Sequence, residues 1–185
     1  MGKQVEMRFD SEMEETLVSI PVDIHTNVKI TSIEIGDTYF DINFEDTLKR
    51  TIRHRVFEPA GKFPNKKKDG DMETPEEALQ REERDKAAIL SKLIKIYEAP
   101  PVKADDYQDY VEKCVKALTP RLSKVSVNLK VIYDSEFKFS RIPNWGFIEK
   151  YEEGVPPTLA YSAWELANRV NKPASTPGLS IDDLA

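Results

Sequence analysis

Apolar and polar residues alternate along the first part of the chain, which is the pattern of half-buried β-strands. The alternation changes phase once: Val28 and Ile30 share one face, whereas Ile33 and Ile35 share the other. A change of phase inside a strand indicates a β-bulge or a sharp bend, which we expect near residues 31 and 32.

Two further strands follow, and their side chains predict how they pair. Gly36 and Asp37 are expected to form a two-residue hairpin turn, with strands over residues 38–45 and 51–58. We expect the register that places apolar residues opposite one another in the core. The expected core pairs are Phe44 with Ile52 and Phe40 with Val56, and the expected outer pairs are Asn43 with Arg53, Asp41 with Arg55, and Tyr39 with Phe57.

The middle of the chain has the periodicity of two amphipathic helices. The first is expected over about residues 75–97, because Thr74 is a good N-cap, Pro75 suits the first helical position and Glu77 completes a capping box. The second is expected over about residues 104–118, with prolines after each helix. The pattern then returns to strands.

Strong alternation over residues 125–133 predicts a strand in the last third of the chain. Shorter strands are expected over residues 137–142, 148–151 and 158–161, with a loop at residues 143–147. A second capping box, Ser162 to Glu165, predicts a short helix.

The order of these elements predicts the fold class. Three strands, a helical insertion at about residues 74–119 and further strands are the order of a five-stranded antiparallel OB-fold-like barrel, a mainly β fold of the α+β class. A bent first strand suits such a barrel, because that strand serves both sheets. We expect an acidic N-terminal arm at residues 1–26, the domain at residues 27–170 and a flexible tail at residues 171–185.

Composition removes several classes of function. A single cysteine, Cys114, excludes an internal disulfide framework and a cysteine-rich zinc site. No apolar run is long enough for a membrane span and no signal peptide is recognisable, so we expect no membrane contact and a cytoplasmic location. Gly-rich phosphate loops and nucleophile motifs are also missing from the sequence, so we expect neither an enzyme nor a cofactor.

Charge is distributed unevenly. The net charge is −6, yet residues 47–68 contain eight Lys or Arg and a single acid, Glu58. Such a segment is typical of a site for a polyanion. Alternation places Arg53, Arg55 and Phe57 on one strand face, with His54 on the apolar face, where we expect a hydrogen-bonded core histidine. Guanidiniums suit phosphates and exposed rings suit unpaired bases.

The candidate site has extensions, each with a plainer alternative. They are the turn residue Arg50, the ring of Tyr39, a lysine clamp of Lys62, Lys66, Lys67 and Lys68, and Trp145 in the loop at residues 143–147. The strand face is alternatively a solvated surface with Arg55 tied to Asp41, the lysines an ordinary loop, and Trp145 part of the barrel core.

The arrangement resembles a phage-type single-stranded DNA-binding protein over residues 27–185. The resembling parts are VKITSIEIGDTYFDINFED, IRHRVFEP, the helical insertion, VNLKVIYDSEFKFSRIPNWGFIEKY and the tail ending IDDLA. The resemblance implies non-sequence-specific binding of single-stranded DNA in replication or recombination, with replication proteins as partners of the tail. The tail has only Asp182 and Asp183 as acids and ends in Leu184 and Ala185, unlike the strongly acidic, often aromatic-ended tails of that family.

A structural or assembly protein, such as a virion component built on a β-barrel, is the alternative function. A nuclease ranks third, because the acidic residues have no recognisable catalytic arrangement.

Overall fold

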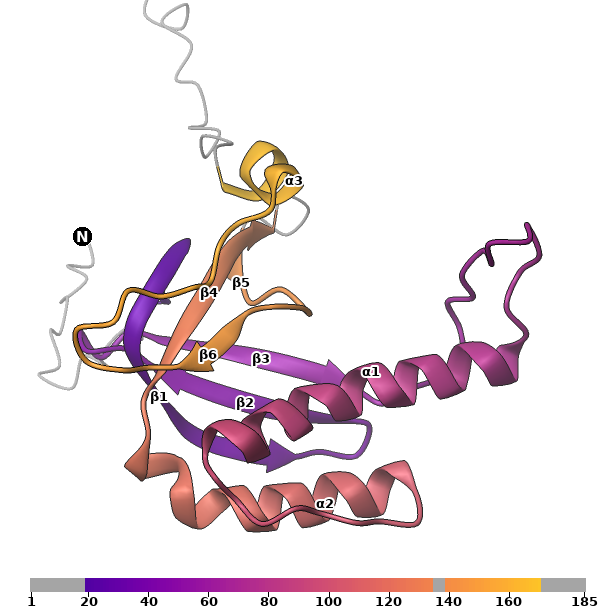
Figure 1. Cartoon of the computed structure of the whole chain (residues 1–185), viewed down its shortest axis with the longest axis horizontal. Coiled ribbons are helices and arrows are strands. Elements are labelled where there is room, and N and C mark those ends of the chain that lie inside the picture. Colours follow the sequence, from indigo (N-terminus) through magenta and orange to yellow (C-terminus); the bar gives the residue numbers. More distant parts are fainter. Residues whose placement is uncertain (1–18, 135–138, 171–185) are drawn as a thin grey trace, which may run out of the picture.

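The computed structural model describes residues 19–134 and 139–170, which form an α+β fold around a mostly antiparallel sheet (Figure 1). The strands in these ranges are β1 (Asp23–Ile35), β2 (Tyr39–Glu45), β3 (Thr51–Phe57), β4 (Val127–Asp134), β5 (Phe139–Arg141) and β6 (Ile148–Lys150). They follow the order β3-β2-β1-β4-β5, and β6 also pairs with β4. The described part thus has six strands, against the five of the expected barrel, and β5 and β6 lie within the short strands expected over residues 137–142 and 148–151.

Strand β1 bends and serves two ladders, as its change of phase predicts. Its first half, through Val28, pairs with β4, and its second half, from Lys29, pairs with β2. The expected bulge is confirmed as a register shift between Ile30 and Ser32. A second irregularity lies at Asn27, whose φ of 55° falls in the left-handed region that asparagine tolerates.

The first strand begins earlier than the sequence pattern indicates. We expected the fold to start at residue 27, but β1 begins at Asp23 and Ile20 is fully buried. The backbone of Ile20 donates a hydrogen bond to Thr51, next to a parallel bridge between Ser19 and Thr51. The polar residues of this segment did not indicate a strand, because the strand is held by backbone pairing.

The predicted register of β2 and β3 is confirmed at all five predicted pairs. The turn before β2 differs by one residue. Gly36 donates its N–H to the carbonyl of Tyr39, so Asp37 and Thr38, not Gly36 and Asp37, form the two-residue loop. Gly36 has a different role: a Cβ there would lie 2.4 Å from the Tyr39 ring, which covers the glycine.

The helices are α1 (Pro75–Ile96) and α2 (Tyr107–Leu118), followed by the 3₁₀ helix η1 (Thr119–Lys124). The capping box of Thr74 and Glu77 is confirmed. The second helix starts three residues later than expected, because the Asp106 side chain accepts the Asp109 N–H and caps it. The proline expected to end this helix lies instead in the first turn of η1.

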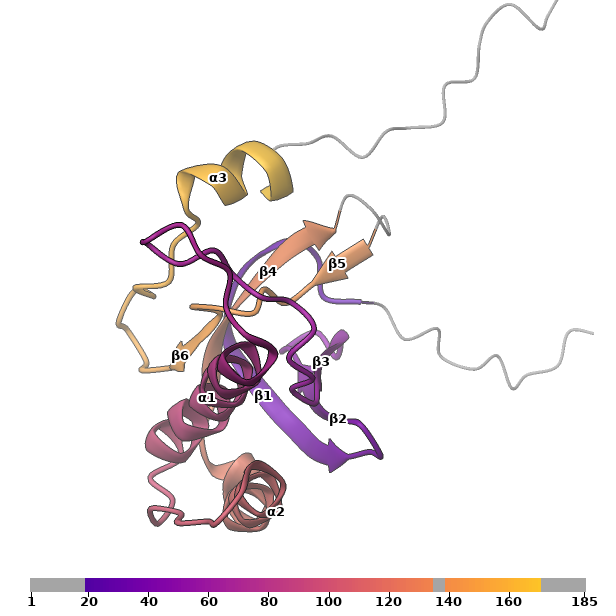
Figure 2. The same cartoon turned by 90° about the vertical axis from the view of Figure 1, so that its right-hand side faces the viewer.

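The core fills the space between the sheet and the two long helices. Apolar side chains from β1 to β4 pack with those of α1 and α2, and Phe40 and Phe44 are among the largest fully buried residues. Helix α2 lies beside both α1 and β1 (Figures 1 and 2). These helices do not cover the outer face of β2 and β3.

The end of the described chain packs against β4 through polar contacts. Helix α3 (Ala163–Glu165) has the expected capping box, and the chain continues as the π-helical turn η2 (Leu166–Val170). The buried ammonium of Lys130 lies 3.0 Å from the carboxylate of Glu165, and the Tyr161 hydroxyl donates to the Val131 carbonyl. These bonds fix α3 beside the end of β4 (Figure 1).

The expected strand at residues 158–161 is wrong. Thr158 instead donates its N–H and hydroxyl to the Glu149 carboxylate on β6, so a side chain takes the bonds that a neighbouring strand would take.

Three expectations fall wholly or largely outside the described residues. They are most of the N-terminal arm, the turn into β5 and the C-terminal tail with its partners. Within residues 19–134 and 139–170, no helix is long and apolar enough to cross a membrane.

Candidate nucleic-acid interface

The outer face of β2 and β3 brings together four of the predicted site residues: Tyr39, Arg53, Arg55 and Phe57. At its centre lies Asp41, whose carboxylate is buried beneath the two arginines. Arg55 donates two hydrogen bonds to this carboxylate, at 2.8 and 2.7 Å. The guanidinium of Arg53 approaches it to 3.6 Å. We call Arg53 and Arg55, together with the Asp41 carboxylate that they share, the first arginine pair.

Two aromatic rings complete this surface. The guanidinium of Arg55 lies 3.7 Å from the centre of the Tyr39 ring, a cation–π contact that fixes its orientation. The Phe57 ring meets Tyr39 edge-on, with centroids 6.4 Å apart, and Phe57 is 60% exposed. The rigid strand backbone thus presents cationic groups and an accessible ring side by side.

The electrostatics of the first arginine pair leave one excess positive charge. The hydrogen bonds from Arg55 lower the pKa of Asp41 below its ordinary value despite burial, so the carboxylate is ionised at neutral pH. One carboxylate faces two guanidiniums, and the Arg53 side chain is 59% exposed. Its remaining N–H donors are available to an anion such as a phosphate. Arg55 is tied to Asp41, as the plainer alternative holds.

Toward β1, this surface ends at an acidic residue, Glu34. Asn43 donates to the Ser32 hydroxyl at 2.8 Å and to the Glu34 carboxylate at 3.0 Å. A polyanion crossing the sheet is therefore favoured near β3 and disfavoured near β1.

Folding reduces the charge of the basic segment at residues 47–68. Lys49 pairs with Glu45 and Lys67 with Glu77, each at 2.8 Å or less. Arg50 pairs with Asp46 at 2.7 Å in the turn between β2 and β3. All of these acids precede or follow the segment in sequence. The composition of the segment alone therefore overstates the positive charge that remains after folding. Arg50 therefore lies in the turn with its charge paired to Asp46.

The carboxylate of Asp46 organises that turn. Burial opposes its ionisation, but N–H donors of Arg50 and Leu48 outweigh burial and lower the pKa below its ordinary value.

The lysine clamp is anchored to helix α1. The Glu82 carboxylate accepts the N–H groups of Ala60 and Gly61, at 2.9 and 3.2 Å. Arg81 donates to the Phe63 carbonyl at 2.7 Å and also binds Glu73. The loop thus projects beyond the start of α1 and is joined to that helix by these contacts (Figure 1). Within the described residues, the three lysines of this loop without an ion pair are Lys62, Lys66 and Lys68.

His54 occupies the core directly behind the first arginine pair. It is buried and tilts against the ring of Phe147, 4.8 Å away, which confirms both residues as core. The expected hydrogen bond is missing at Nε2, which has no partner among the described residues. Burial, followed by the nearby charge of Arg141, lowers the pKa of His54 to about 4. The ring is neutral at pH 7.

Trp145 lies apart from the first arginine pair. It is 58% exposed and lines a hollow of about 480 Å³ between its own loop and α3. The other aromatic and cationic residues that line this hollow are Trp164, Arg141 and Arg169. Sequence reasoning missed all three. The signal present in the sequence is Trp164, two residues after the expected helix cap Ser162.

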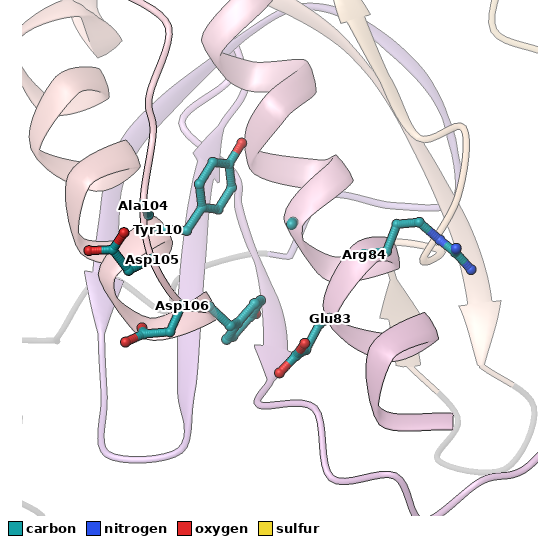
Figure 3. A pocket seen from close by; sticks show the side chains of 8 residues that line it. Glu83, Arg84, Ala104, Asp105, Asp106 and Tyr110 are labelled. Atoms are coloured by element: carbon teal, nitrogen blue, oxygen red, sulfur yellow. The ribbon is translucent and has the colours of Figure 1, made fainter. Parts of the chain in front are cut away.

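A second hollow, between α1 and the start of α2, is acidic (Figure 3). Glu83, Asp105 and Asp106 line it, while the side chain of Arg84 points away from these carboxylates. Within residues 19–134 and 139–170, no group of His, Cys, Asp or Glu is arranged to hold a metal ion. This face repels a polyanion.

The sequence matches no family model and no curated protein, and no solved structure gives a significant match to the fold.

Proposed function

We propose that this protein binds single-stranded DNA without sequence preference, in the cytoplasm, during replication or recombination. The observation that carries the proposal is the first arginine pair, flanked by Tyr39 and Phe57 on the outer face of β2 and β3. Phosphates bind the exposed donors of Arg53, and an unpaired base stacks on Phe57. The unpaired lysines of the loop at residues 59–72 add long-range attraction.

The strand arrangement supports an OB-fold-like barrel as the scaffold for this function. Strand β1 pairs with β2 and β4 through separate halves, and helical elements join β3 to β4. In OB-folds the face of the second and third strands binds oligonucleotides, and here that face holds the first arginine pair. Strands β3 and β5 contact each other at the position where such a barrel closes.

An assembly protein is the second candidate function. The loop at residues 59–72 exposes Phe63 and Met72, and four of the eight basic residues of the segment, namely Lys49, Arg50, Arg55 and Lys67, are already paired with acids. Exposed apolar side chains on an anchored loop suit a protein partner as well as a nucleic acid.

Single-strand selectivity tests the proposed function. We expect labelled oligothymidine of about 16 nucleotides to bind more tightly than duplex of equal length, because stacking requires unpaired bases. The affinity should fall with salt, with a log–log slope of about −0.7 for each phosphate contact. Fluorescence anisotropy over a salt series measures both quantities. No salt-sensitive binding would favour the assembly function, and equal affinity for duplex would indicate a general polyanion surface.

A further inference from the structure

A second arginine pair repeats the chemistry of the first at the other end of the sheet. Asp134 on β4 is buried, and its carboxylate lies 2.8 Å from Arg141 and 3.8 Å from Arg169. The guanidinium of Arg169 lies 5.4 Å from the centre of the Trp164 ring. As at Asp41, one buried carboxylate orients two guanidiniums, and an aromatic ring supports one of them.

The second arginine pair borders an aromatic hollow. Trp145 and Trp164 both line it and are 58% and 59% exposed. Lys130 and Glu165 also line it, but they form a buried ion pair and contribute no excess charge. The hollow therefore places two guanidiniums beside two accessible indole rings.

The two arginine pairs are neighbours across the contact between β3 and β5. His54 lies between Arg53 and Arg55 in sequence, and its pKa responds to the charges of both Arg141 and Asp41. Strand β5 lies between α3 and β3 in both views (Figures 1 and 2). A strand of nucleic acid leaving the first arginine pair over β3 can continue over β5 to the hollow.

The chemistry of the hollow suits a nucleotide unit. Planar guanidiniums bind phosphate oxygens in pairs, and indole rings stack on any base at about 1–3 kcal/mol per base. Both groups have fixed orientations here, through Asp134 and through the anchoring of α3 by Lys130. Fixed groups lose little entropy when a ligand binds.

We propose that the hollow of Trp145, Trp164, Arg141 and Arg169 is a second contact for the same single strand of DNA. One base stacks on the indole rings, and its phosphate binds the arginines. This inference rests on the proposed function and adds a site to it.

Two double variants of the full chain test the second contact against wild type with oligothymidine of about 16 nucleotides. Trp145→Leu with Trp164→Leu removes the rings, and we expect a loss of affinity of about 5-fold to 100-fold, the equivalent of one stacked base. Trp145→Phe with Trp164→Phe keeps aromatic rings, and we expect it to retain most of the affinity. Circular dichroism melting confirms that both variants fold.

The outcomes separate this inference from the proposed function. A loss with leucine that phenylalanine restores supports the second contact. Wild-type affinity in the leucine variant, or an equal loss in both variants, would overturn the second contact and leave the proposed function standing. A wild-type protein that binds no oligothymidine would overturn both.

Discussion

Removing the charges of the first arginine pair is expected to weaken single-strand binding about 10-fold to 100-fold. Each lost charge-assisted hydrogen bond to a phosphate is worth about 1.5–3 kcal/mol. The variant for this test is Arg53→Gln combined with Asp41→Asn and Arg55→Gln. The salt slope should also become shallower by about 0.7 for each lost phosphate contact.

The design of that variant follows from the burial of Asp41. Replacing Arg55 alone would remove both hydrogen bonds to the buried Asp41 carboxylate and leave it only the longer contact with Arg53, and the lost stability would confuse binding with unfolding. Changing Asp41 and Arg55 together removes both charges, so that neither is left without its partner. Anisotropy titrations of the triple variant and of Arg53→Gln alone separate the two arginines.

The matched control is Lys95→Gln, which removes one positive charge from an exposed position on α1, away from the outer face of β2 and β3. It should bind almost as tightly as wild type. A folded triple variant with wild-type affinity, or a control that loses as much as Arg53→Gln, would remove the site from this face.

The stability of the protein should fall in mild acid because of His54. Its pKa is about 4 in the folded protein, against an ordinary value of 6.5. Between these two pH values, His54 is protonated in the unfolded chain but not in the folded chain. The free energy of unfolding therefore decreases as pH falls. From about pH 7 to about pH 4.5, this residue should account for about 2 kcal/mol of lost stability.

Urea unfolding of wild type and His54→Leu over this pH range measures the effect. Leucine does not titrate, so the difference in unfolding free energy between the two proteins isolates the histidine from the carboxylates. That difference should shift by about 2 kcal/mol in favour of the variant at the lower pH. A difference that stays constant would show that His54 is not held neutral in the core.

The register of the β2–β3 hairpin was predictable because the inner and outer faces of the two strands had to favour the same pairing. Apolar alternation left one pairing that matched Phe40 with Val56 inside and Asp41 with Arg55 outside, and β2 and β3 adopt that pairing. The preceding turn was misplaced by one residue because glycine suits hairpin turns. In the structure Gly36 is required instead by the ring packed above it.

The charge of the site was less predictable than its backbone. Counting residues in a window ignores acids such as Glu77, which lies ten residues beyond Lys67 and binds it. The second arginine pair depends on the same kind of distant contact, between Asp134 and Arg169. No local pattern records that contact, because it forms only when α3 packs beside the end of β4.

The most direct test of the central claim is a map of backbone amide chemical shifts in the isotope-labelled full chain during titration with oligothymidine. We expect saturable shifts concentrated in β2 and β3, around Tyr39, Arg53, Arg55 and Phe57. The acidic hollow between α1 and α2 should remain unchanged. Shifts confined to the helices, or no saturable shift at all, would contradict the claim that the outer face of β2 and β3 binds single-stranded DNA.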